Sequence, residues 1–329
     1  MSAPLLDIYI NHWTEDWKIG EKAFRALGLQ RGVDWSGIRV TVVHDGSPAF
    51  PDTYFAGLPF AVRQVELMHG GIAKARNWCI DDGDGEWIKW CDWDDMFCSV
   101  YGLKDLTHAL EIGQDYDLLW FDVMFELLDG RVIRKNTYDP VVVHGKAIRR
   151  EWLREHRIRF PEHLTWCEDS AMLAVCEMEI DGKRKGYIRT DAPIYSFIER
   201  RGSLCNRPEI LFANRKSFFQ RHCYVQAEME KRGLEREARM MTARNLGDAM
   251  YTLEIAEITD DMTEFREKVR DYYRARRKDL TKVTSGEMRE VLRAVNLEDR
   301  CHIEAREFWD WLRRLNDGEQ GGSDCLCMT

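Results

Sequence analysis

The fold is decided by the stretch Glu86-Trp87-Ile88-Lys89-Trp90-Cys91-Asp92-Trp93-Asp94-Asp95, where a strand-like run ends in three carboxylates within four residues. In an α/β sheet, ligand-binding groups collect at the carboxyl ends of the strands, because the loops converge there over a rigid sheet. Crowded carboxylates cost free energy unless a cation neutralises them, and hard oxygen ligands select Mg²⁺ or Mn²⁺. The stretch therefore predicts an α/β fold with a divalent-metal site. A solvated acidic turn is the alternative.

The rest of the first 125 residues alternates short apolar runs with helix-like stretches, which is typical of a parallel-rich sheet with crossover helices. The strands that we expect are 5–10, 38–44, 86–91 and 117–123. Helices are expected from a cap at Thr14 to about Gly28, then over 71–80 and 149–156.

The pattern changes beyond Pro208, where apolar residues recur at helical intervals up to about Leu315. We therefore divide the chain into an α/β domain over 1–207, an α-helical region over 208–318 and a disordered tail over 319–329.

Charge and composition restrict the function. Of the 329 residues, with a net charge of −9, residues 200–329 carry 25 basic and 24 acidic side chains, so the acidic excess lies in residues 1–199. An acidic domain suits a bound cation, whereas a nucleic-acid binder usually has a basic excess. No stretch is long and apolar enough to span a membrane, and the N-terminus lacks the pattern of an export signal, so we expect a soluble, cytoplasmic protein with reduced thiols.

Three further segments carry candidate functional residues. Asp45-Gly46-Ser47 follows a predicted strand, and Asp45 can accept hydrogen bonds from a nucleotide base or belong to a plain turn. Glycines precede a predicted helix that contains Arg76, an arrangement that favours phosphate or a base carbonyl but also starts ordinary helices. Glu168 and Asp169 begin another helix, either as a general base and its neighbour or as favourable charges at a helix N-terminus.

Taken in order, these segments resemble glycosyltransferase family 2, the inverting group with the nucleotide-sugar fold called GT-A. The resemblance covers residues 5 to about 207 and implies a mixed central sheet, whereas the helical C-terminal region lies outside it. Its matching segments are His44-Asp45-Gly46-Ser47, Ala75-Arg76-Asn77, Asp92-Trp93-Asp94-Asp95, His144-Gly145-Lys146, Arg149-Arg150, Arg159-Phe160-Pro161-Glu162, Glu168-Asp169 and 195–203.

The resemblance implies roles on the donor side. Asp45 would contact the base, uracil, while Arg76 holds the nucleotide and Asp92 lies near the ribose. Asp94 would be the main ligand of Mn²⁺ or Mg²⁺, assisted by Asp95 and completed by Asp92.

Further roles follow from the same resemblance. Asp169 would be the general base, with Glu168 orienting it or touching the acceptor, and Arg200, Arg201 and Ser203 would lie on a loop that closes over the diphosphate. Two departures from the family pattern are His44, where Asp is common, and Trp93, where a small residue is usual. The indole of Trp93 either lies against the donor or fills space.

The expected reaction is a metal-dependent, inverting transfer of a sugar from a nucleoside-diphosphate donor, a UDP-sugar, to a hydroxyl group. The acceptor is a glycan, a lipid-linked glycan or, as in bacteriophages, hydroxymethylated DNA. Residues 200–244 hold 11 basic against 5 acidic residues, an excess that either follows a phosphate backbone or forms a solvated helical face. The helical region would serve acceptor recognition, a lid or homodimerisation. A nucleotide-sugar sensor or a scaffold is the non-enzymatic alternative.

Overall fold

The computed structural model describes residues 4–13, 16–135, 142–188, 192–200, 211–256, 258 and 260–317. The chain forms two compact units, residues 1–207 and residues 208–329. Thr14 and the tail over 319–329, for which the sequence predicts a helix cap and disorder, lie outside the described residues.

The first unit contains a central sheet of seven strands. Its order is β10-β6-β9-β4-β1-β2-β3, and neighbouring strands are parallel except β9, which is antiparallel to both β4 and β6. This confirms the prediction of a mixed, parallel-rich sheet. The strands are β1 (Leu6–His12), β2 (Ile38–Asp45), β3 (Val62–Leu67), β4 (Trp87–Asp92), β6 (Leu118–Phe121), β9 (Lys146–Arg149) and β10 (Lys185–Ile188).

A second sheet of four strands has the order β5-β11-β7-β8. Strand β11 is parallel to β7 and antiparallel to β5, and β7 and β8 form an antiparallel pair. The strands are β5 (Met96–Phe97), β7 (Val123–Glu126), β8 (Val132–Lys135) and β11 (Tyr195–Ile198).

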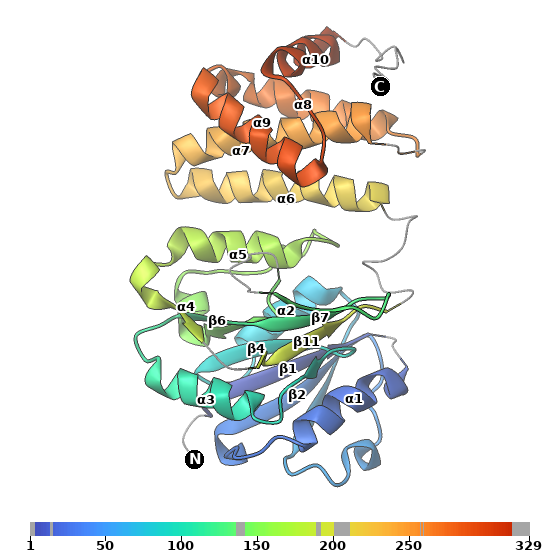
Figure 1. Cartoon of the computed structure of the whole chain (residues 1–329), viewed down its shortest axis with the longest axis vertical. Coiled ribbons are helices and arrows are strands. Elements are labelled where there is room, and N and C mark those ends of the chain that lie inside the picture. The colour runs from blue at the N-terminus through green and yellow to red at the C-terminus, as the bar shows by residue number, and fades with distance from the viewer. Residues whose placement is uncertain are drawn as a thin grey trace. The chain divides into compact units, whose positions relative to one another are not determined.

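Helices cover both faces of the central sheet. Figure 1 shows α1 and α3 on one face and α2, α4 and α5 on the other. On the first face, Ile8 of β1, Phe24 of α1 and Leu106 of α3 belong to one buried apolar core. The helices are α1 (Trp17–Gly28), α2 (Ile72–Asp81), α3 (Gly102–Ile112), α4 (Arg150–Glu155) and α5 (Glu168–Glu179).

Two local predictions were wrong. Helix α1 is capped by Asp16, whose carboxylate accepts the Lys18 N–H at 3.0 Å, two positions after the predicted cap. The apolar run over 117–123 is not one strand but passes from β6 of the central sheet into β7 of the second sheet. The break falls at Asp122, whose buried carboxylate accepts from Arg134 at 2.6 Å, a polar anchor that hydrophobicity does not predict.

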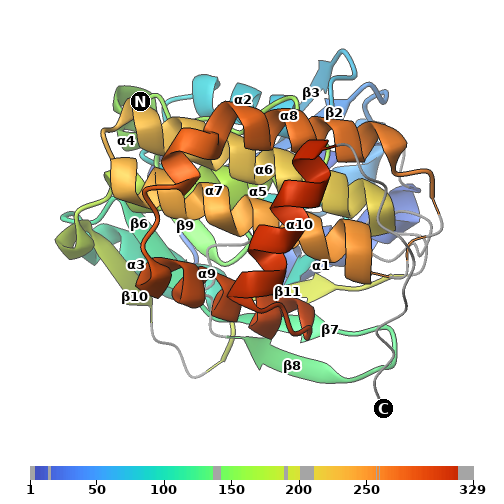
Figure 2. The ribbon, with the colours of Figure 1, turned by 90° about the horizontal axis from the view of Figure 1, so that it is seen from above.

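Helices are the regular secondary structure of the second unit over its described residues, which confirms the prediction of a helical region. Helices α6 and α7 pack side by side, and α10 packs against α7, α8 and α9 (Figure 2). A π-helical turn, Tyr251–Ile255, continues α7. The helices are α6 (Leu211–Lys231), α7 (Glu235–Met250), α8 (Thr263–Leu280), α9 (Ser285–Asp299) and α10 (Ala305–Asp317). Within the described ranges of the chain, every helix is too short or too polar to cross a bilayer.

Candidate functional site

Three parallel strands bring polar residues to one edge of the central sheet. In the register of the sheet, Asn11 of β1 lies opposite Asp92 of β4, and His12 lies opposite His44 of β2. Since these strands run in the same direction, their carboxyl ends meet at this edge, as the sequence predicts.

Arg76 of α2 connects this edge to the start of α5. Its guanidinium is buried, with 2 % of the residue exposed. Nη2 donates to Asp92 Oδ1 at 3.1 Å, while Nη1 donates to Glu168 Oε1 at 2.9 Å and to Asp169 Oδ1. One cation thus serves carboxylates from two different elements, and a planar guanidinium suits such a fork better than an ammonium group does. Four of the predicted site residues are brought together in this way.

Glu168 and Asp169 occupy the first turn of α5, which favours negative charge. Burial raises the pKa of Glu168 to about 8, and the neighbouring charge of Asp169 adds to the rise while Arg76 opposes it. Glu168 therefore keeps its proton to a higher pH than an ordinary glutamate does. Asp169 also accepts the backbone N–H of Val143 at 3.3 Å through Oδ2, which ties it to the segment that precedes His144.

Asp92, Asp95 and His144 form a compact group whose ligand atoms all lie within 4.8 Å of one another. Asp92 Oδ2 is 3.5 Å from His144 Nε2, and Asp95 Oδ2 is 3.9 Å from His144 Nδ1. Among the described residues, neither Asp95 Oδ2 nor His144 Nδ1 has a hydrogen-bond partner, although both atoms are buried. Carboxylate oxygens with an imidazole nitrogen are a donor set that fits Mn²⁺ and, through the oxygens, Mg²⁺.

The pKa values of the two aspartates of this group shift in opposite directions. Burial raises the pKa of Asp95 well above its usual range, and the charges of Asp92 and Asp94 add to the rise. Burial also acts to raise the pKa of Asp92, but His144 and Arg76 outweigh it, so the net shift is downward. Asp92 is therefore the more readily ionised of the two.

Asp94, which the resemblance makes the main metal ligand, does not join this group. Its Oδ2 pairs with Nε of Arg200, the residue two positions after β11. The predicted metal ligand Asp94 and the predicted diphosphate-binding residue Arg200 therefore contact each other. Arg201 and Ser203, predicted to share a loop with Arg200, lie outside the described residues.

Asp45 lies at the end of β2 and holds the loop before α2. Its carboxylate accepts the backbone N–H groups of Gly70 at 2.8 Å and Gly71 at 2.9 Å, and it lies 3.0 Å from Nδ1 of His69. Gly71 has φ of 86°, a conformation that favours glycine. The sequence suggests that these amides bind phosphate or a base carbonyl. In the structure they donate to Asp45. The predicted contact of Asp45 with a base stays a prediction.

Trp93 is 1 % exposed and packs in the apolar core. Its ring stacks on Phe50 with centroids 5.0 Å apart, and its Nε1 donates to the backbone carbonyl of Asp16 at 3.3 Å. Of the two alternatives for Trp93, these contacts favour filling space over contacting a donor.

Sequence reasoning missed two residues of this edge. His144 belongs to a segment that matches the family but had no predicted role, although its ring contacts both Asp92 and Asp95. Asn11 is 6 % exposed, and neither polar atom of its amide has a hydrogen-bond partner among the described residues. A polar residue near the end of an apolar strand is the signal that points to Asn11. For His144 no local signal exists.

The sheets, their helices and the polar strand ends define the GT-A glycosyltransferase fold. The solved structures that share it include TarS of S. aureus, whose complex with UDP-GlcNAc has a TM-score of 0.63 and 16 % sequence identity over 95 % of this chain and 92 % of that one. The TarS 1–349 complex with UDP has a TM-score of 0.62 at the same identity. This chain spans 55 % of the longer TarS structure. No protein-family model matches the sequence, and no curated protein does.

Proposed function

We propose that the protein is a glycosyltransferase that moves a sugar from a nucleoside-diphosphate donor, a UDP-sugar, to a hydroxyl group with inversion. The observation that carries the proposal is the bridge formed by Arg76, because it holds a carboxylate at the end of β4 and a carboxylate pair at the start of α5 in one buried cluster. A transferase needs these two sides together: one for the leaving diphosphate and one for the acceptor. The TarS structures with UDP and UDP-GlcNAc, which share the fold, support the choice of donor.

On the acceptor side, Asp169 is the general base. A carboxylate within hydrogen-bond reach can take the proton of the acceptor hydroxyl as that oxygen attacks the anomeric carbon. Arg76 and the N–H of Val143 hold Asp169 in place, and Glu168, which binds the same guanidinium, orients Asp169. Attack on the face opposite the leaving diphosphate inverts the anomeric configuration.

On the donor side, Asp92 and Asp95 with His144 would hold a divalent cation, and Asp94 would join them once Arg200 releases it. Such a cation, when bound, would offset the negative charge of the leaving diphosphate. Arg200 now pairs with Asp94, and we propose that it contacts the diphosphate when the donor binds. Asn11, next to Asp92 in the sheet register, would add a hydrogen bond to the nucleotide.

The test is to incubate the protein with a panel of nucleotide sugars and Mn²⁺ or Mg²⁺ and to follow slow release of nucleoside diphosphate. We expect release from one donor and tight binding of its nucleotide in calorimetry. A sensor would bind the nucleotide sugar without releasing diphosphate. If no nucleotide sugar bound, the proposal would be wrong.

A further inference from the structure

A row of rings leads away from the candidate base along the second sheet. The backbone N–H of Val143 bonds to Asp169, so the next residue, His144, begins beside the base. The imidazole of His144 stacks on Tyr195 with an interplanar angle of 11° and lies 5.9 Å from the ring of Phe197, centroid to centroid. Strand β11 thus leads from the neighbourhood of the candidate base toward the outer part of the second sheet.

The sheet register extends the row. Phe197 of β11 pairs with Phe125 of β7, and their ring centroids are 5.1 Å apart. Side chains alternate along a strand, so Lys135, which pairs with Val123 two residues before Phe125, shares the same face. Its Nζ lies 4.2 Å from the centre of the Phe125 ring. We name His144, Phe197, Phe125 and Lys135 the aromatic row.

The exposure of the row differs from that of the core. Tyr195 is 1 % and His144 4 % exposed, so both belong to the buried inner end of the row. Phe197 and Phe125 are half-buried and Lys135 is exposed, and these three form its accessible part. Neighbouring phenylalanines that keep part of their rings accessible suit a ligand with an apolar face. The C–H face of a sugar ring is such a face, and its hydroxyl groups stay free for polar contacts. The centroid distances along the row, 5.9 Å and 5.1 Å, match the spacing of two linked sugar rings.

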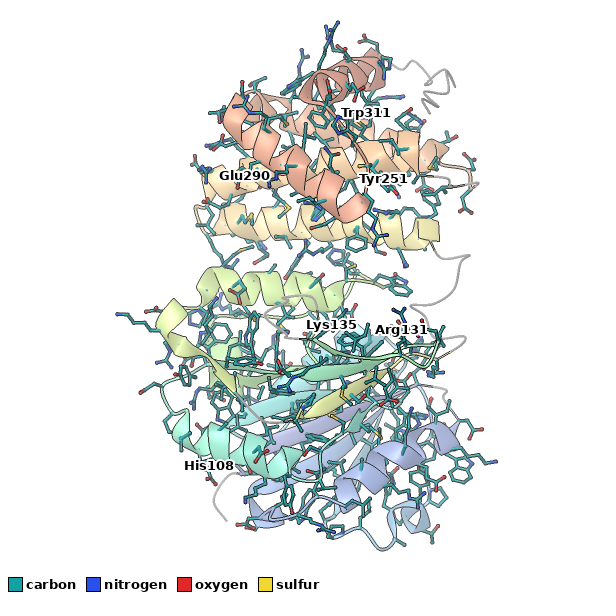
Figure 3. All side chains as sticks on the ribbon, viewed as in Figure 1. His108, Arg131, Lys135, Tyr251, Glu290 and Trp311 are labelled. Carbon is teal, nitrogen blue, oxygen red and sulfur yellow. The ribbon has the colours of Figure 1, made fainter. Side chains whose placement is uncertain are left out.

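Lys135 adds an uncompensated charge. Figure 3 labels Lys135 and Arg131 on the hairpin between β7 and β8. Arg131 pairs with Asp129 at 2.7 Å, and Arg134 pairs with Asp122. Among the described residues, Lys135 has no carboxylate within ion-pair distance, and its ammonium group makes a cation–π contact with Phe125. Its charge is therefore available to an anionic group at the outer end of the row.

We infer that the aromatic row is the acceptor subsite and that the acceptor is a saccharide with a negatively charged group, a phosphate or a carboxylate, about two ring lengths from the reacting hydroxyl. The inference rests on the proposed function. Its support is the continuity of the row with Asp169 and the charge complementarity at Lys135.

The experiment measures binding of small probes to the full chain in the presence of UDP and Mn²⁺, by saturation-transfer NMR with titration. The probes are methyl glycosides of common hexoses and of their disaccharides, the matching 6-phosphates, and methyl glucuronide. Phe125→Leu and Phe197→Leu keep apolar volume but remove the rings, and we expect each to weaken binding of all bound probes by about three- to tenfold. Lys135→Gln should weaken only the anionic probes, by about three- to fivefold, and Lys135→Arg should restore them.

The matched control is Lys18→Gln, because Lys18 is also an exposed lysine over an aromatic ring, 5.7 Å from the ring centre of Trp17. The inference would be overturned if wild type bound anionic and neutral probes equally, or if it bound no probe. Binding of duplex DNA in place of every saccharide would also overturn it. Circular dichroism checks that each variant is folded. UDP affinity in the same samples separates the two failures, since loss of UDP binding by the wild-type chain refutes the proposed function itself.

Discussion

Arg76 Nη2 lies 3.1 Å from Asp92 Oδ1, and this contact joins helix α2 to the end of strand β4. The same guanidinium also binds Glu168 and Asp169, so its removal would leave several buried carboxylates without their cation. The arrangement makes Arg76 both a structural and a functional residue.

We expect Arg76→Met to lower the free energy of unfolding by about 3–5 kcal/mol, the usual cost of breaking a buried ion pair. Urea denaturation measures the change. The control is Arg63→Met, because Arg63 pairs with Asp82 while 43 % of its side chain is exposed, and exposed pairs contribute about 1 kcal/mol or less. Similar losses for both variants would contradict a special role for Arg76.

Asp169→Asn should keep donor binding but slow sugar transfer by about 10²-fold or more, the scale expected when a positioned base is removed. Glu168→Gln should cost clearly less, because the raised pKa of Glu168 favours its neutral form, whose shape the amide keeps. Single-turnover kinetics with saturating donor compare the two variants. Near-normal turnover by Asp169→Asn would rule out its role as base.

Asp94→Ala should abolish metal-dependent binding of the donor, because it removes the carboxylate predicted to hold the cation. Arg200→Gln frees the same carboxylate from its ion pair, so it should strengthen binding of Mn²⁺ alone while it weakens binding of the nucleotide. Isothermal calorimetry with and without Mn²⁺ tests both. The metal hypothesis is wrong if wild type and Asp94→Ala bind the nucleotide sugar with the same affinity, both with and without Mn²⁺.

Gly20→Ala tests whether Trp93 fills space. A Cβ atom at position 20 would overlap the indole of Trp93, and overpacking of this kind costs about 1–3 kcal/mol. Thermal unfolding should show the loss, and Trp93→Phe in the same chain should recover part of it. Donor affinity should remain unchanged in Trp93→Phe. A large fall in that affinity would instead support contact between the indole and the donor.

Stability should depend on pH through His44. Burial, with a contribution from the neighbouring His12, lowers the pKa of His44 from 6.5 to about 4 in the folded state. His12 Nδ1 and His44 Nδ1 lie 2.9 Å apart, so a proton on both rings is unfavourable. Because the unfolded chain takes up the proton first, the contribution of His44 to stability is complete above pH 6.5 and is lost as the pH falls toward 4.

Urea unfolding from pH 8 to pH 4 measures this loss, which His44→Asn should reduce. His108→Asn is the control, since His108 is exposed on α3 and is labelled in Figure 3. An unchanged pH profile in His44→Asn would show that other groups cause the acid sensitivity.

The sequence by itself determined the local elements and much of the edge that carries the site. Short apolar runs predicted β1, β2 and β4 within two residues at each end, because a buried parallel strand needs a continuous apolar segment. The acidic ends of β2 and β4 and the carboxylates that start α5 were likewise visible. Each of these features depends on neighbours within a few positions along the chain.

Only the tertiary structure decided which side chains meet. Arg200 reaches Asp94 across 106 positions, and Arg76 reaches Asp169 across 93. His144 joins Asp92 and Asp95 for the same reason, since β9, which follows it, pairs with β4 in the central sheet. Periodicity and propensity describe contacts within one element. These pairs result instead from the packing of strands and helices, and that packing balances charge and burial over the whole unit.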